Sequence, residues 1–405
     1  MVGFENKYPG GIVSKLPVLA VLIALLPLAG CGSNPSKSTT TAPRLASSEV
    51  GRSLSQRAAG DTSLARLDVY AKRTQGGTLT GPYAGRADVE QFIARMERQG
   101  FSRPQLVGIF SRVQPDPWIL EYMNRQWRPA SGPNGAWTRY RAKHITGDML
   151  AKGDGFWRSH EQTLNRAAQT YGVPPEYVVA IIGIETKWGG YMGKHRIIDA
   201  LSTLAFDYPR RADYFAGELE QFLIMTRDEH IDPFQPVGSF AGAMGLGQFM
   251  PSSYHKFAVD FDGDGHRNLW DAEDAIGSVA NYFNKNGWRR GQAVTTRASG
   301  GDALPGMMDT GFKTSYAVGS LKSQGLRPAV ALPDDQRVSL LRLDAAGGYE
   351  YWLGFDNFYV ITRYNNSTYY AMTVHQMAQA LRNRHGGGGP TLRMTQQSRD
   401  GKPAG

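Results

Sequence analysis

One carboxylate, Glu185, falls on the apolar face of a helix predicted from the stretch PPEYVVAIIGIETKWGG, residues 174–190. Val178, Ile181 and Ile182 recur at the spacing of one helix face, and Glu185 continues that face. The remaining positions are largely apolar, so the helix is expected to be buried on nearly all sides. A buried carboxylate must be paired, hydrogen-bonded or kept protonated. Glu185 is therefore either a structural ion-pair partner or a general acid held protonated by an apolar site.

An acidic loop with the spacing of a metal site follows in VDFDGDGHRNLWD. Its candidate ligands are Asp260, Asp262, Asp264, His266 through its backbone carbonyl, and Asp271. Two features depart from the calcium-loop pattern, because the last ligand is Asp where Glu is usual and Arg267 replaces an apolar residue. The spacing favours a structural calcium clamp, and a solvated acidic turn is the alternative.

Small residues dominate a third stretch, PVGSFAGAMGLGQFMPSSYHKF, residues 236–257. Glycines and alanines let a backbone approach a ligand closely, and Gln248 supplies a donor and an acceptor among them. A tightly packed helix crossing also uses small residues. The stretch alone does not decide between the two.

The elements expected to carry these residues are mainly helical. Pro174 and Pro175 suit the start of the helix with Glu185, and Gly189 and Gly190 suit its end. Helical periodicity runs from RADVEQFIARMERQG to about residue 290. A small antiparallel β subdomain is predicted after these helical segments, from runs such as RVSLLRL and YEYWLGF. A late helix, YYAMTVHQMAQALRNR, follows it.

Composition sets broad limits on function. The length of 405 residues suggests two or three domains, and 41% hydrophobic with 20% charged residues is ordinary for a globular protein. The net charge of +9 favours a polyanionic partner such as nucleic acid, an anionic wall polymer or a membrane surface. Because the Lys and Arg residues are scattered, a solvated basic surface is the plainer interpretation. One cysteine excludes an intramolecular disulfide.

The N-terminus has the order of an export signal. Lys7 and Lys15 precede LPVLAVLIALLPLAGC, an apolar run too short for a comfortable membrane span. Its end at Cys31 resembles a bacterial lipobox, in which this cysteine would be lipidated. Residues 32–65 are rich in Ser, Thr, Ala and Pro and are expected to form a flexible tether. Because Gly32 and not Asp follows the cysteine, the resemblance implies the periplasmic face of the outer membrane.

The motifs also occur in the order of a known family. IETKWGG, GSFAGAMGLGQFMPSS, the acidic loop and NFYVITRYNNSTYYAM resemble the membrane-bound lytic murein transglycosylase B family over about residues 85–382. The resemblance implies a mainly helical α+β fold with a lysozyme-like core, an all-helical domain and a small antiparallel β subdomain. The expected division is signal peptide 1–31, tether 32–65, helical domain 85–155, catalytic core with calcium loop 156–292, β subdomain 293–356, return to the core 357–384 and disordered tail 385–405.

The activity implied by the resemblance is cleavage of the MurNAc-β-1,4-GlcNAc bond of peptidoglycan, leaving 1,6-anhydro-MurNAc ends, in cell-wall turnover. Glu185 matches the single catalytic acid/base of the family. An ordinary glycosidase uses two carboxylates, whereas here the substrate's N-acetyl group and C6 hydroxyl would replace the second. Asp207 and Asp213 remain candidates for a second carboxylate. No cofactor is expected for catalysis. A structural Ca²⁺ is expected in the acidic loop.

The other matched positions belong to the saccharide groove of the family. They are Tyr140, Arg210, Arg211, Ser239, Gln248, Tyr282, Tyr364 and Tyr370. The implied partners are peptidoglycan glycan strands and, through Cys31, a membrane. A hydrolytic muramidase on the same fold and a wall-binding lipoprotein without activity are the alternatives. The export signal argues against a nucleic-acid partner.

Overall fold

The structure is a computed structural model of the chain. It describes residues 63–72, 77–125, 134–301, 304 and 308–386. The expected signal peptide with Cys31, nearly all of the tether and nearly all of the tail lie outside these residues. Helix α2 starts at Ser63, inside the last part of the range expected to be tether, and α16 reaches Gly386, inside the range expected to be tail.

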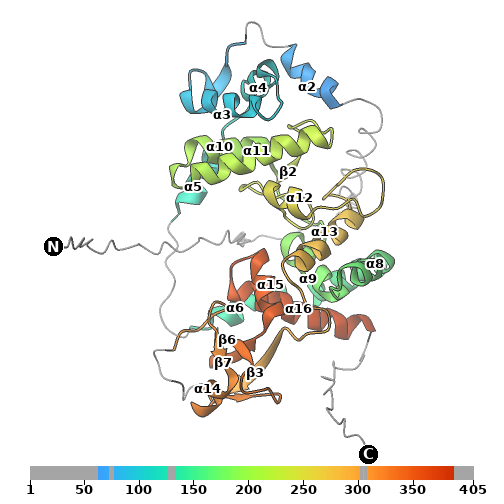
Figure 1. Ribbon diagram of the computed structural model, residues 1–405, viewed down its shortest axis with the longest axis vertical. Coiled ribbons are helices and arrows are strands. Elements are labelled where there is room, and N and C mark those ends of the chain that lie inside the picture. Colours follow the sequence, from blue (N-terminus) through green and yellow to red (C-terminus); the bar gives the residue numbers. More distant parts are fainter. Residues whose placement is uncertain (1–62, 73–76, 126–133, 302–303, 305–307, 387–405) are drawn as a thin grey trace, which may run out of the picture.

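Helices from two distant parts of the sequence form one end of the molecule (Figure 1). Helix α11 packs against α10, α12 and α2, while α4 packs against α2 and α3. Their buried faces carry apolar residues at helical spacing, such as Val89, Phe92, Ile93 and Met96. The elements here are α2 (Ser63–Ala71), η1 (Gly81–Tyr83), α3 (Ala87–Glu97), α4 (Arg103–Phe110), α5 (Pro117–Asn124), α10 (Ile197–Asp207), η2 (Pro209–Arg211) and α11 (Ala212–Asp228).

The middle of the molecule is built around helix α9, which contacts α7, α8, α13 and α16. Helix α16 returns from the far end of the sequence to lie against α9. The elements of this part are α6 (Ala136–His144), α7 (Gly147–Ser159), α8 (Glu161–Tyr171), α9 (Pro175–Thr186), α12 (Pro251–Phe257), α13 (Ala272–Lys285), α15 (Asp356–Tyr364) and α16 (Thr368–Gly386). A short antiparallel pair of strands, β1 (His195–Arg196) and β2 (Val237–Gly238), lies beside α10.

An antiparallel sheet of five strands lies at the opposite end, with the order β4-β6-β7-β3-β5. Its centre is the hairpin of β6 and β7, in which Leu340 pairs with Leu353 in register. These leucines and Val338 belong to a small apolar core of their own. The elements are β3 (Thr295–Ser299), β4 (Tyr316–Ala317), α14 (Val318–Ser323), β5 (Arg327–Pro328), β6 (Arg337–Ala345) and β7 (Gly348–Gly354).

Helix α9 is buried along almost its whole length, as the apolar pattern predicts. Pro174 is its N-cap and Pro175 its first residue, so the predicted start is confirmed. The predicted end is wrong, because the helix stops at Thr186 and Lys187 takes the left-handed conformation expected of a glycine, with φ of 53°. Trp188 explains this early stop, because its ring packs back on Gly183, where a Cβ would lie 2.3 Å from a ring carbon.

In the part of the chain that the structure describes, no helix has both the length and the apolar character that a membrane crossing requires.

Candidate active site

Glu185 lies in the last turn of α9, the helix that four other helices surround. The phenol of Tyr370, on α16, donates a hydrogen bond of 2.5 Å to its Oε1. Burial raises the pKa of Glu185 to about 7, although the hydrogen bond from Tyr370 acts in the opposite direction. Among the described residues no lysine or arginine contributes to this shift. The ion-pair alternative for Glu185 therefore finds no partner there, and the carboxyl is poised to exchange a proton near neutral pH.

Three of the four tyrosines predicted from the sequence lie close to this carboxyl, and the fourth, Tyr282, packs behind one of them. The charge of Glu185 contributes to raising the pKa of Tyr140, Tyr364 and Tyr370, after the larger effect of burial, so all three lie close to it. Tyr364 and Tyr282 pack with ring centroids 4.7 Å apart. Tyr364 donates a 2.5 Å hydrogen bond to the carbonyl of Gly247. Tyrosine rings thus lie beside Glu185, two of them with phenols held by hydrogen bonds, and such rings are suited to packing against the apolar faces of sugars.

The segment of small residues contacts the end of α9. The hydroxyl of Thr186 donates to the carbonyl of Leu246 over 3.0 Å, which ties the segment to the residue next to Glu185. Gln248 has a left-handed backbone, with φ of 51°, and its amide donates to the carbonyl of Gly245 over 2.9 Å. Ser239 is nearly buried, and its Oγ accepts hydrogen bonds from the segment's own backbone. Gln248 therefore lies beside the site, while Ser239 shapes the turn.

The arginine pair lies farther along, in the short helix η2 before α11. Arg210 is exposed, and the guanidinium of Arg211 lies 4.0 Å from the ring centroid of Tyr214. Asp207 forms an ion pair of 2.8 Å with Arg86. Neither Asp207 nor Asp213 contributes to the pKa of Glu185. Within the described ranges no second carboxylate therefore affects the pKa of Glu185.

The acidic loop brings two of the predicted carboxylates together with a third, Asp274, that the sequence did not point to. Oxygens of Asp260, Asp262 and Asp274 lie within 4.8 Å of one another. Asp264 instead accepts a 2.8 Å hydrogen bond from the backbone N–H of His266, and Asp271 caps the start of α13. Asp260 accepts hydrogen bonds from loop N–H groups, which holds the loop closed.

Asp274 was missed by the sequence argument because it lies beyond the twelve-residue loop, in the first turn of α13. Its carboxylate accepts backbone hydrogen bonds from Phe261, Asp262 and Asn268. Burial raises its pKa to about 7. The signal available in the sequence was the acidic run DAED after the loop, which a helix turn directs back toward it. The converging oxygens have the chemistry of a hard divalent cation site.

The protonatable carboxyl of Glu185 beside tyrosine rings, in a mainly helical fold, has the chemistry of an enzyme that cleaves glycosidic bonds by acid catalysis. Residues 84–379 match the family described as "Transglycosylase SLT domain". Over 309 residues the chain is 55% identical to membrane-bound lytic murein transglycosylase B of Escherichia coli (strain K12), covering 75% of this chain and 85% of that protein.

Solved structures agree with the sequence comparison. Escherichia coli lytic transglycosylase SLT35 in complex with calcium is 54% identical, with a TM-score of 0.72, over 76% of this chain and 96% of that one. SltB3 from Pseudomonas aeruginosa in complex with NAG-NAM-pentapeptide is 29% identical, with a TM-score of 0.64, over 74% and 80% of the two chains. The chain belongs to the transglycosylase SLT domain family and is a lytic transglycosylase with a lysozyme-like fold. The family resemblance and the mainly helical α+β class expected from the sequence are confirmed.

Proposed function

We propose that this chain cleaves the MurNAc-β-1,4-GlcNAc bond of peptidoglycan to leave 1,6-anhydro-MurNAc ends in cell-wall turnover, with Glu185 as its single acid and base. The observation that carries the proposal is the carboxyl of Glu185, whose pKa burial raises to about 7 and whose Oε1 is held by Tyr370 at 2.5 Å. A group with a pKa near the working pH both donates and accepts protons efficiently. One residue therefore serves both halves of the reaction.

In the first half, protonated Glu185 donates its proton to the bridging oxygen while the bond from that oxygen to the muramyl C1 breaks. The departing sugar leaves as a neutral alcohol. The resulting carboxylate keeps the hydrogen bond from Tyr370, which stabilises its charge. In the second half, the muramyl C6 hydroxyl attacks C1 and gives its proton to Glu185. The enzyme regains its starting protonation, and no water is consumed, which is why no second carboxylate is needed.

The saccharide groove is assigned to the tyrosines, the amide of Gln248 and the neighbouring loop. Tyr140, Tyr364 and Tyr370 offer rings and phenols near Glu185, and Tyr282 packs against Tyr364. Ser239, Arg210 and Arg211 were predicted for the same groove, and we place them at its edges, where the arginines would meet anionic groups of the substrate. Stacking on aromatic faces and a few directed polar contacts are the usual means of holding a sugar chain.

We also propose a structural Ca²⁺ in the loop between α12 and α13. The carboxylates of Asp260 and Asp262 converge with that of Asp274, and carboxylate oxygens are the ligands that calcium prefers. Asp264, Asp271 and the backbone carbonyl of His266 complete the set predicted from the sequence. The solved relative SLT35 contains calcium. An ion here would hold two helices of the groove wall together, and it supplies no group to the reaction.

For location we propose a lipid anchor at Cys31 and the periplasmic face of the outer membrane. The support is the order of charged residues, apolar run and LAGC at the N-terminus, together with a relative that is named membrane-bound. The basic net charge of +9 suits both an anionic membrane surface and an anionic wall polymer.

Digestion of purified sacculi followed by mass spectrometry tests the activity. The expected products end in 1,6-anhydro-MurNAc, one water lighter than the reducing ends that a hydrolytic muramidase leaves. Glu185→Gln, which keeps the shape but lacks the proton, is the matched control. Reducing ends from the wild-type protein would replace the proposal with hydrolysis. Binding of glycan without release of any fragment would replace it with a wall-binding role.

A further inference from the structure

Helix α6 carries Tyr140, one of the tyrosines close to Glu185, but its own sequence supplies no cap for its first turn. Its N-cap residue is Gly135, in a left-handed conformation with φ of 74° and without a side chain that could accept a hydrogen bond. The first N–H groups of a helix have no partner within the helix, so they need an acceptor from elsewhere. In α6 this acceptor comes from the β subdomain.

The carboxylate of Asp344, near the end of strand β6, lies at the start of α6. It accepts hydrogen bonds from three successive backbone N–H groups: Asn134 at 2.9 and 3.1 Å, Gly135 at 2.9 Å and Ala136 at 3.3 Å. The bond from Asn134 contributes most to lowering the pKa of Asp344, although burial acts in the opposite direction. Asp344 is therefore charged at neutral pH, and a negative charge is favourable at a helix N-terminus.

The turn after Asp344 contacts the same helix at further points. The backbone N–H of Ala346 donates a 3.0 Å hydrogen bond to the hydroxyl of Thr138. A Cβ at Gly135 would lie 3.2 Å from the Cα of Ala346, so the two backbones are close together. The hairpin of β6 and β7 therefore holds the first turn of α6 through several residues, and Gly135 and Asp344 are 209 positions apart in the sequence.

Tyr369 connects this contact with the site of Glu185. The backbone N–H of Asp344 donates a long hydrogen bond of 3.4 Å to the phenol oxygen of Tyr369, whose ring centroid lies 5.9 Å from that of Tyr140. Tyr369 directly precedes Tyr370, the residue that donates to Glu185. Burial and then the charge of Glu185 raise the pKa of Tyr140. A displacement at the start of α6 would therefore reach the groups around Glu185.

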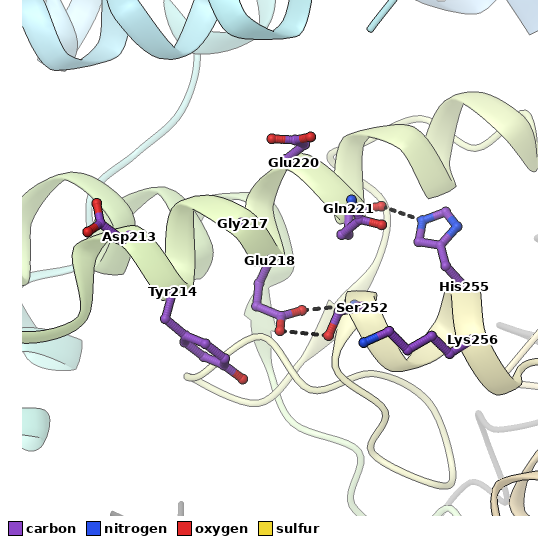
Figure 2. A pocket seen from close by; sticks show the side chains of 9 residues that line it. All are labelled: Asp213, Tyr214, Gly217, Glu218, Glu220, Gln221, Ser252, His255 and Lys256. Atoms are coloured by element: carbon purple, nitrogen blue, oxygen red, sulfur yellow. Dashed lines mark hydrogen bonds between the residues drawn. The ribbon is translucent and has the colours of Figure 1, made fainter. Parts of the chain in front are cut away.

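Helix α12 has the same kind of start (Figure 2). It follows the segment that contains Gln248, and its N-cap residue, Met250, makes no side-chain hydrogen bond to it. Glu218, on α11 and only 4% exposed, accepts hydrogen bonds of 2.8 Å from the backbone N–H and the hydroxyl of Ser252, in the first turn of α12. In both helices a carboxylate from another element takes the place of the missing cap.

We propose that Asp344 is a positioning residue for the reaction, because by holding the start of α6 it sets the place of Tyr140 beside Glu185. The β subdomain then contributes to catalysis through the helix that it holds. The inference rests on the proposed function in one respect, which is that Glu185 is the acid. Without the carboxylate of Asp344, α6 shifts, Tyr140 moves away from Glu185 and water reaches the acid.

The first test is the activity of three variants on purified sacculi. Asp344→Ala should lower kcat/KM about tenfold, the fold-change that corresponds to the loss of a helix cap. Asp344→Asn keeps one acceptor oxygen and should lose less. Glu350→Ala is the matched control and should equal the wild type, because Glu350 lies in the same hairpin but accepts its 3.2 Å hydrogen bond from the indole N–H of Trp352 in its own strand. Wild-type kcat/KM in Asp344→Ala would overturn the proposal.

The pH profile separates positioning from a simple loss of folded protein. The phenols that face Glu185 belong to Tyr140, Tyr364 and Tyr370, on α6, α15 and α16, and all three have raised pKa values. Among the described residues no charged side chain contributes to the pKa of Glu185, which burial raises to about 7. Water at Glu185 should therefore move the alkaline loss of activity in Asp344→Ala to lower pH, by about half a unit. A smaller folded fraction would lower activity equally at every pH, and such a result would overturn the proposal.

A double-mutant cycle shows whether Asp344 acts through Tyr140. Tyr140→Ala alone should lower kcat/KM, and the addition of Asp344→Ala should cause little further loss, because the residue that it positions is gone. Losses that multiply would overturn the proposal. If Asp344→Ala does not fold, as judged by circular dichroism, Asp344→Asn replaces it in all three tests. Reducing ends from the wild type would refute the proposed function, while the cycle still decides the role of Asp344, since it requires only that Glu185 be the acid.

Discussion

Replacement of Glu185 by Gln is expected to abolish activity and at the same time to stabilise the folded protein at neutral pH. Burial raises the pKa of Glu185 from its ordinary 4.5 to about 7. The folded protein thus holds the proton more tightly than the unfolded chain does. This tighter binding of the proton adds to the free energy of unfolding. The contribution is fully present below pH 4.5 and is lost as the pH rises from 4.5 through about 7.

The size of the effect follows from that difference in pKa. At about 1.4 kcal/mol per pKa unit, ionisation of buried Glu185 lowers the free energy of unfolding by about 3 kcal/mol at pH 8, and about 2.5 kcal/mol of this loss falls between pH 5 and pH 8. Gln is uncharged throughout, and its carbonyl still accepts the hydrogen bond from Tyr370. The advantage of the variant over the wild type should therefore grow by about 2.5 kcal/mol over the same interval.

Urea unfolding of both proteins, followed by tryptophan fluorescence at pH 5 and pH 8, measures this difference. Sacculus digestion on the same samples should show activity lower by about 10²–10⁴-fold, the usual worth of a general acid. The refuting result is that the free energies of unfolding of the wild type and the variant change by the same amount between pH 5 and pH 8. Glu185 would then titrate near 4.5 in the folded state, and the argument that burial keeps it protonated would be refuted.

Three further predictions concern the neighbours of Glu185, the calcium loop and the anchor. Tyr370→Phe removes a hydrogen bond that lowers the pKa of Glu185, so the loss of activity at high pH should move upward by about one pH unit; an unchanged pH profile contradicts this. Asp262→Ala should lower the Tm and abolish its dependence on Ca²⁺, which in the wild type is worth roughly 2.7 kcal/mol at a hundredfold excess over Kd; chelation that stops catalysis without changing the Tm would make the ion catalytic. Cys31→Ser should release the protein from membranes or leave the precursor uncleaved, and unchanged fractionation and mass would refute lipidation.

The sequence by itself determined the features that depend on local spacing. The apolar periodicity of residues 175–186 placed Glu185 in a buried helix, and the structure buries α9 as predicted. The order of the motifs led to the family, and the family comparison confirms it. Alternating apolar runs placed strands between 293 and 356, where the sheet is found. The buried helix and the strands follow from apolar repeats of 3.6 and of two residues, which can be read from a local stretch of sequence without knowledge of the fold.

Only the tertiary structure decided which distant groups meet. Tyr370 holds Glu185 from 185 positions away because α16 packs against α9. Asp274 joins the acidic loop because the first turn of α13 directs it there, outside the loop pattern. Lys187 ends α9 in the left-handed conformation that glycine usually takes, because the ring of Trp188 packs on Gly183. Asp344 likewise reaches the start of α6 only when β6 packs against that helix. Each of these depends on side-chain volume and burial across elements, quantities that local periodicity does not contain.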